Sequence, residues 1–275
     1  MSLFLCPLCG KALTDEGRGL RCDGGHCFDR AKEGYVHLLP VGQKNSKAPG
    51  DDKGMVAARR AFLDKDFYAP LRRGLQELAL QLTGSEPVIL DAGCGEGYYT
   101  AGIRQTLLDA GKSPRMAGID ISKFSVQKAA KRYSGIEFAV GSVYRLPVPD
   151  ASMDLLINVF SPLAIEEFHR VLKPGGYFIY VVPAAMHLWE MKEVLYDKPY
   201  PNEEKETSYP GFVYDRIVPV EFTLHLPGQE NIQALFGMTP YAWKTPRTGK
   251  DRLAALSELD CRAAFHIHVY KKAEG

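Results

Sequence analysis

The sequence holds 275 residues, of which 45% are hydrophobic, so it is long enough for one large α/β domain and a small module. Its formal net charge of +1 excludes a uniformly basic nucleic-acid-binding protein, and any surface for RNA must come from a local patch of charge. No apolar run reaches the roughly 18 residues that a membrane-spanning helix requires, and the first residues lack the basic region of a signal peptide. We therefore expect a cytoplasmic protein with reduced cysteines.

Residues 1–41 contain a cluster of potential metal ligands. Cys6 and Cys9 form a C-x-x-C pair, and Cys22 follows after an interval that could form a hairpin. Zinc prefers four tetrahedral sulfur and nitrogen ligands, and two short-spaced pairs can supply them. The spacing leaves the fourth ligand open between His26 and Cys27. Because a segment of about 40 residues cannot stabilise itself with a hydrophobic core, we predict a zinc ribbon.

The residues that follow the cysteines mix basic and aromatic side chains, over residues 28–40. Such a mixture is typical of a nucleic-acid-binding face, although the same aromatic side chains could simply pack the ribbon. Residues 42–84 are predicted to form a linker and helices. The linker is polar and rich in glycine, proline and charge, which favours a loop. Helices are predicted over residues 55–63 and 69–82, the second from leucines at helical spacing.

Strands and helices alternate from residue 85 to the end, which predicts an α/β domain with a parallel sheet and a ligand at the carboxyl ends of its strands. Two late segments with alternating polarity fit a sixth and a seventh strand, and a proline-rich stretch fits a loop over the site. The predicted strands are residues 88–91, 116–120, 136–140, 153–160, 177–183, 216–226 and 262–270, the later helices are 125–133 and 164–171, and the loop is 197–211.

A glycine-rich turn follows the first of these strands and is flanked by acids. Gly93 and Gly95 let the backbone approach a ligand closely, and Asp91 stands just before them. Asp120 ends the second strand, where a carboxylate can accept both ribose hydroxyls of a nucleoside. S-adenosylmethionine has no pyrophosphate and carries a cationic sulfonium and amino group. An acid beside the turn therefore favours this nucleoside over a dinucleotide. Further contacts are expected from the pair after the third strand, Ser142 and Val143.

The ordered set of strand, acid, glycine turn, second acid and L-K-P-G-G resembles the class I S-adenosylmethionine-dependent methyltransferases over residues 85–183. This class has a Rossmann-like sheet of seven strands. The whole chain is similar to a narrower family, the bacterial 23S ribosomal RNA (guanine-N1)-methyltransferases of the RlmA type. The motifs that carry this resemblance are C-P-L-C-G, H-C-F-D-R-A-K-E-G-Y-V-H-L-L-P, A-R-R-A-F-L, L-D-A-G-C-G-E-G-Y-Y-T and M-T-P-Y-A-W.

The resemblance implies a homodimer that methylates a guanine in a hairpin of 23S ribosomal RNA, with the ribbon as the RNA-recognition module. It implies that His26, rather than Cys27, completes the zinc site, and that Asp120 binds the ribose. Cys27 departs from the family pattern. The resemblance also implies cofactor contacts from Tyr68, Gly95, Glu96 and His187.

One residue is a candidate for reading the substrate. Asn158 ends the fourth strand, where it could hydrogen-bond the edge of a guanine, or could simply cap the strand. No general base stands out. Two other functions fit the same motifs: a small-molecule methyltransferase with a structural zinc clip, and a non-catalytic zinc-ribbon RNA-binding protein.

Overall fold

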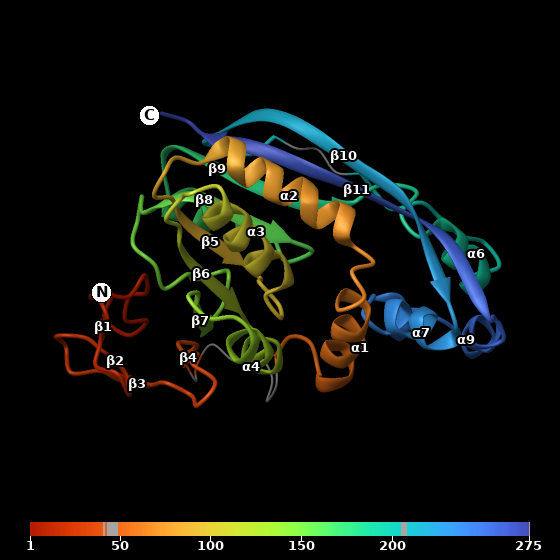
Figure 1. Ribbon diagram of the computed structural model, residues 1–275, viewed down its shortest axis with the longest axis horizontal. Coiled ribbons are helices and arrows are strands. Elements are labelled where there is room, and N and C mark those ends of the chain that lie inside the picture. Colours follow the sequence, from red (N-terminus) through yellow and green to blue (C-terminus); the bar gives the residue numbers. More distant parts are fainter. Residues whose placement is uncertain (41, 43–48, 205–207, 275) are drawn as a thin grey trace.

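A computed structural model describes residues 1–40, 42, 49–204 and 208–274, and its centre is an eight-stranded mixed sheet (Figure 1). Six neighbouring strands are parallel, and only β11 runs against both of its neighbours. In spatial order the strands are β10 (Phe212–Pro227), β11 (Glu258–Lys272), β9 (Leu172–Pro183), β8 (Met153–Val159), β5 (Val88–Ala92), β6 (Arg115–Asp120), β7 (Glu137–Val140) and β4 (Val36–His37).

Helices cover both faces of the sheet because successive strand residues point to opposite sides. In β5, Ile89 packs in one hydrophobic cluster with Leu71 and Leu107, whereas its neighbour Leu90 packs in a second cluster with Phe168. The helices are α1 (Lys53–Leu63), α2 (Ala69–Leu82), α3 (Tyr98–Asp109), α4 (Lys123–Arg132), α5 (Ile165–Val171), α6 (Trp189–Leu195), α7 (Gln229–Gly237), α8 (Tyr241–Lys244) and α9 (Arg247–Ala254).

The predicted fold class is confirmed, with one addition that the sequence analysis missed. The sheet has eight strands where seven were expected, because β4 of the N-terminal module pairs in parallel with β7. In a seven-stranded sheet β7 would leave an unpaired row of backbone groups at the edge, and β4 partly covers it. The two strands predicted last, 216–226 and 262–270, are also longer than expected and form one antiparallel pair, with a register shift between Tyr214 and Arg216.

The N-terminal module is a small three-stranded sheet, with β1 (Thr14–Asp15), β2 (Gly19–Arg21) and β3 (Cys27–Asp29). It is fixed to the large sheet by more than β4. The Glu137 carboxylate of β7 accepts hydrogen bonds from the Ser2 hydroxyl and the Leu3 amide. Phe4 and Leu13 lie in the same buried cluster as Leu90 of β5. The ribbon therefore shares a hydrophobic core with the α/β domain.

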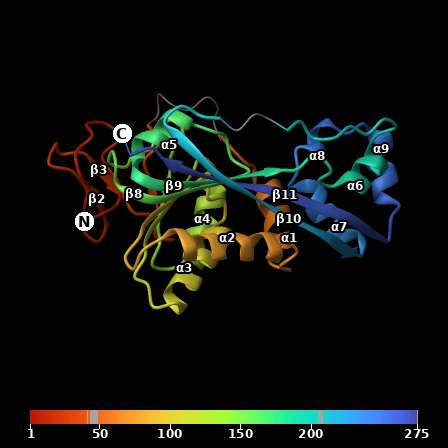
Figure 2. The same cartoon turned by 90° about the horizontal axis from the view of Figure 1, so that it is seen from above.

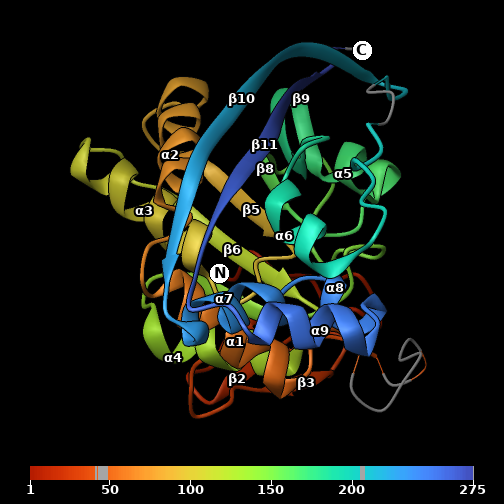
Figure 3. The ribbon, with the colours of Figure 1, turned by 90° about the vertical axis from the view of Figure 1, so that its right-hand side faces the viewer.

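The long pair β10–β11 extends beyond the rest of the sheet and carries α7, α8 and α9 at its far end (Figures 2 and 3). These helices pack with α6 and α1, and they lie at the opposite end of the molecule from the ribbon (Figure 2). None of the described helices is long and apolar enough to cross a membrane. Parts of the predicted linker, residues 43–48, and of the predicted 197–211 loop, residues 205–207, lie outside the described residues.

Candidate functional site

The glycine-rich turn between β5 and α3 places backbone atoms that no side chain covers at the carboxyl edge of the sheet. Gly93, Gly95 and Gly97 have φ angles of 93°, 55° and 82°, in the left-handed region that favours glycine. At Gly93 there is also no room for a side chain, because a Cβ would lie 2.1 Å from the Ser161 hydroxyl oxygen. The Gly95 amide donates a 2.9 Å hydrogen bond to Asp120, which joins this turn to the end of β6.

Three carboxyl groups surround this turn: those of Asp91 and Glu96 are buried, and that of Asp120 is half-buried. Burial raises the pKa of Asp91 to about 7, an effect that the Thr100 hydroxyl opposes by donating a 2.6 Å hydrogen bond. Burial, together with the charge of Asp64, raises the pKa of Glu96 to about 7. The pKa of Asp120 is also raised by burial, although two backbone amides that donate to it act in the opposite direction.

Two oxygen atoms of these acids are buried without a hydrogen-bond partner among the described residues: Oδ1 of Asp91 and Oε2 of Glu96. A buried acceptor left without a donor costs about 1–3 kcal/mol, so the arrangement favours a ligand that brings donors or positive charge. S-adenosylmethionine carries an amino group and a sulfonium, and the chemistry of this acidic turn therefore fits it. A dinucleotide would bring the negative charge of a pyrophosphate to the same carboxylates.

The turn forms part of a cavity of about 710 Å³ at the carboxyl ends of the strands. The structure brings all nine predicted cofactor residues to its wall: Tyr68, Asp91, Gly93, Gly95, Glu96, Asp120, Ser142, Val143 and His187. Such agreement is expected for a doubly wound sheet, where ligands bind at the carboxyl ends of the strands.

Tyr68 and His187 lie on the side of the cavity that faces β11. Their rings contact Phe265 of β11, with ring centroids 5.0 Å and 4.5 Å from it. The Nδ1 atom of His187 accepts a 3.2 Å hydrogen bond from the Ala264 amide. Burial lowers the pKa of His187 to about 3, and the nearby charge of Lys192 adds to this effect. His187 is therefore a neutral acceptor at physiological pH.

Several residues of the cavity wall were not predicted. Arg59 and Asp51, which form an ion pair, reach it from α1 and the segment before it. Phe160 and Tyr144 follow the ends of β8 and β7, and a search of every strand end would have found them. Residues 238–241 also line the cavity, from the end of α7 and the start of α8. The M-T-P-Y motif at these positions carries part of the family resemblance, but nothing in its pattern places it at the site.

Asn158 is not part of the cavity wall. Its side chain is fully buried, and Nδ2 donates to the carbonyl oxygens of Ala92, at 3.0 Å, and Pro162, at 3.2 Å. It therefore joins the end of β5 to the segment after β8, which is closer to the capping role than to contact with a substrate. The nearby Asp154 accepts hydrogen bonds from the Val88 amide and the Lys173 ammonium, which is a structural role.

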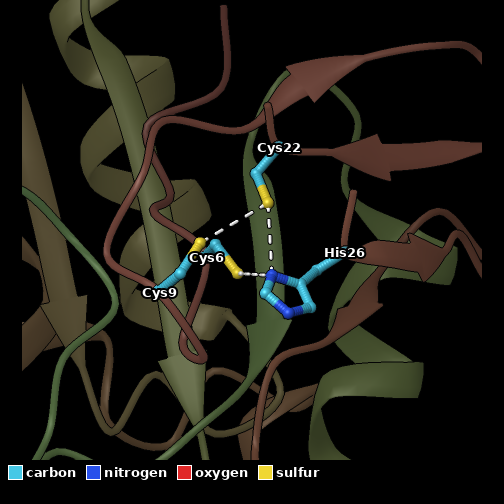
Figure 4. A group of neighbouring side chains, drawn as sticks. All are labelled: Cys6, Cys9, Cys22 and His26. Carbon is cyan, nitrogen blue, oxygen red and sulfur yellow. Dashed lines mark hydrogen bonds between the residues drawn. The ribbon is translucent and has the colours of Figure 1, made fainter. Parts of the chain in front are cut away.

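The ribbon brings four metal-ligand side chains together (Figure 4). The donor atoms of Cys6, Cys9, Cys22 and His26 all lie within 4.8 Å of one another. The Nδ1 atom of His26 is 3.5 Å from the sulfurs of both Cys6 and Cys22, and the sulfurs of Cys9 and Cys22 are 3.6 Å apart. Tetrahedral ligands of zinc stand about 3.5–3.8 Å apart, so this donor set fits Zn²⁺.

Cys27, the alternative fourth ligand, lies outside this cluster. Its side chain is exposed, and its thiol lies 3.6 Å from the Gly25 carbonyl oxygen, to which it donates. Because Cys27 is the first residue of β3, its orientation follows the pleat of that strand, whereas His26 belongs to the preceding turn. The structure therefore favours His26.

The fold, the acidic glycine turn and the cavity at the strand ends define a class I S-adenosylmethionine-dependent methyltransferase. A model of a methyltransferase domain matches residues 84–224, and the zinc-ribbon model described as "RlmA, N-terminal" matches residues 4–47. The chain belongs to the family of 23S rRNA (guanine-N1)-methyltransferases with this N-terminal ribbon. It is 34% identical to the Bacillus subtilis protein YxjB, over 94% of this chain and 92% of that protein, and YxjB is provisionally named as such an enzyme.

A second relative is the 23S rRNA (guanine(748)-N(1))-methyltransferase of Streptomyces fradiae, which is 36% identical over 69% of this chain and 66% of its own length. Among solved structures, the YcgJ protein from Bacillus subtilis is similar with a TM-score of 0.50 and 18% identity, over 74% of this chain and 99% of that chain. At this level of identity, the likeness shows the fold alone.

Proposed function

We propose that this protein transfers a methyl group from S-adenosylmethionine to N1 of a guanine in a hairpin of 23S ribosomal RNA. The observation that carries the proposal is the combination of a zinc ribbon and a complete cofactor cavity in one chain, aligned almost from end to end with a relative provisionally named for this reaction. A small-molecule methyltransferase would have no evident use for the ribbon. A non-catalytic RNA-binding protein would have no use for two buried carboxyl oxygens left without partners.

In this proposal the cavity wall holds the cofactor in three parts. Asp120 would accept the ribose hydroxyls, and Ser142 and Val143 would contact the adenine. Asp91 and Glu96, with the backbone of Gly95, would hold the cationic amino acid end. Tyr68 and His187 close the cavity on the side of β11. When bound, the cofactor supplies an electrophilic methyl group for in-line transfer to a nucleophile.

The acceptor imposes two further requirements. Guanine N1 lies on the Watson–Crick edge, so the base must leave its pair and enter the cavity, at a cost of a few kcal/mol. N1 also carries a proton at neutral pH, which must pass to a base or to water as the methyl group arrives. The protein contributes mainly by holding N1 and the methyl group in line at about 3–3.5 Å. Asn158 supports this geometry indirectly, by fixing the segment after β8 against the end of β5.

The ribbon is proposed to recognise the RNA, and because it shares a core with the sheet, it does so as a rigid extension of the domain. We infer three modules, with the ribbon over residues 1–41, the linker and helices over 42–84 and the methyltransferase domain over 85–275. The family resemblance also supports a homodimer that works where ribosomes are, in the cytoplasm, and light scattering on the purified protein tests the dimer.

The experiment uses unmethylated 23S rRNA made by transcription, the purified protein and radiolabelled S-adenosylmethionine. We expect one methyl group per RNA molecule, located on a single guanine by mass mapping and by a stop in reverse transcription, because a methyl group on N1 blocks base pairing. The matched control is the Asp120→Ala variant, which should bind RNA but transfer methyl groups far more slowly at a cofactor concentration below its raised Kd. A wild-type protein that labels a small-molecule extract but not the RNA would overturn the proposal.

A further inference from the structure

Phe160 combines two features that the activity described above does not explain. It is a non-glycine residue with a φ angle of 55°, a conformation that a bulky side chain rarely adopts. The residue is also 46% exposed at the wall of the cavity, although a large apolar side chain gains by burial. Strained residues of this kind persist only where the surroundings hold them, and they cluster at functional sites.

The surroundings hold Phe160 from three directions. Its amide donates to the Val181 carbonyl of β9, at 3.4 Å. On either side in the chain, the Asn158 side chain is bonded to the carbonyls of Ala92 and Pro162, and Ser161 lies directly against Gly93. The backbone of Phe160 is therefore fixed to the cofactor turn itself, so its ring keeps a constant position relative to the bound cofactor.

Among the described residues, the ring of Phe160 contacts one other aromatic ring. It lies 5.4 Å from the ring of Phe265, which in turn contacts Tyr68 and His187. The cavity continues past Phe160 along the ends of β8 and β9 to residues 238–241, beyond the strand ends that the nucleoside cofactor needs. Phe160 thus presents an exposed aromatic surface at the boundary between the cofactor part of the cavity and the remaining space.

From this geometry we propose that Phe160 is the stacking platform for the methyl-accepting guanine after it leaves the RNA helix. This inference rests on the proposed function. Stacking on the ring replaces the stacking with neighbouring bases that the guanine loses when it leaves the RNA helix. Because the ring is fixed to the cofactor turn, it also sets the position of N1 relative to the methyl group. Because every base has a flat π-surface, the ring positions the base but does not select guanine. Other groups of the cavity must distinguish guanine from adenine.

The test compares Phe160→Leu with Phe160→Trp on unmethylated 23S rRNA. Leucine is apolar but not flat, so kcat/KM for RNA should fall roughly 10- to 100-fold, the range expected for one lost base–aromatic contact. Tryptophan keeps a flat ring and should retain most of the activity. In both variants the Kd for S-adenosylmethionine, measured by calorimetry, should change by less than about twofold, because the ring contacts the acceptor.

A third variant separates the ring from the backbone strain. Phe160→Gly removes the ring but suits the positive φ angle, so it should lose the same RNA activity while still binding the cofactor. As a direct readout, the added tryptophan of Phe160→Trp should lose fluorescence on binding RNA, relative to the wild type.

The outcomes are distinct. A wild type that does not methylate RNA overturns the proposed function and the platform together. An active wild type with a Phe160→Leu variant of equal kcat/KM overturns the platform alone. A Phe160→Leu variant whose only defect is weaker cofactor binding also overturns it, since the ring would then cover the cofactor.

Discussion

The zinc ribbon and the cofactor cavity are both built from tight turns that gather polar side chains, but they depend on their ligands in different ways. The ribbon has strands of two or three residues and relies on four side chains around one point. The cavity lies at the edge of a large sheet with an extensive hydrophobic core. A metal is thus part of the ribbon's folding energy, whereas the cavity is formed by the folded sheet and holds buried acid oxygens whose partners a ligand can supply.

The largest expected effect follows from removing a zinc ligand. Cys9→Ser or His26→Ala should release the metal and unfold the ribbon, because structural zinc contributes about 10–16 kcal/mol in isolated zinc-finger peptides. Since Phe4 and Leu13 share a core with β5, we also expect a lower melting temperature for the α/β domain. Metal content by mass spectrometry and melting by circular dichroism measure both effects.

Cys27→Ser is the matched control for this prediction. It lies beside His26 in the sequence but outside the cluster, so the variant should keep one zinc per chain and the wild-type melting temperature. If Cys27→Ser lost the metal and His26→Ala kept it, the assignment of the fourth ligand would be reversed.

The second effect tests how tightly the cofactor turn is packed. Gly93→Ala places a Cβ 2.1 Å from the Ser161 oxygen and forces a side chain into a φ angle of 93°, so it should destabilise the protein by about 2–4 kcal/mol. Urea unfolding measures this loss. In the double variant with Ser161→Gly the clash is gone and only the backbone strain remains, so part of the stability should return. A double variant no more stable than Gly93→Ala would show that the contact with Ser161 is not the cause.

A smaller effect is expected from replacing Asp120, because losing its carboxylate weakens ligand binding and leaves the hydrophobic core intact. Asp120→Ala should weaken binding of S-adenosylmethionine roughly 10- to 100-fold, as expected for losing charge-assisted hydrogen bonds to the ribose and the acceptor of the Gly95 amide. Titration calorimetry measures the Kd. Asp109→Ala, at the exposed end of α3, is the control and should bind like the wild type. Equal affinities for the two variants would remove Asp120 from the site.

The last effect concerns pH. The pKa of Asp91 is raised from its usual 3.8 to about 7, so the folded protein binds more protons than the unfolded chain between these values. The ligand-free protein should therefore lose stability as pH rises from about 4 to 7, by up to a few kcal/mol. Unfolding free energies measured across this range test the slope. Asp91→Asn cannot ionise and should reduce the slope, leaving the part due to Glu96, whose pKa is also raised to about 7, while weakening cofactor binding. An unchanged slope in this variant would show that Asp91 does not contribute.

The sequence by itself determined the local chemistry. The order of strands, the glycine turn, the acids at positions 91 and 120 and the spacing of the cysteines are short-range patterns, because they depend on residues a few positions apart. They were sufficient for the fold class and for six of the predicted cavity residues, whereas Tyr68, Glu96 and His187 were predicted only from the family resemblance. All nine line the cavity. The helices predicted over 55–63 and 69–82 also match α1 and α2 to within two residues.

Only the tertiary structure decided which distant segments meet. It placed His26 in the cluster and turned Cys27 away, a difference of side-chain direction between neighbours that spacing does not encode. It added β4 to the sheet, moved Asn158 behind the cavity wall and brought residues 238–241 to the cofactor edge. These outcomes depend on pairing and packing between residues far apart in the chain, whose free energy no local pattern records.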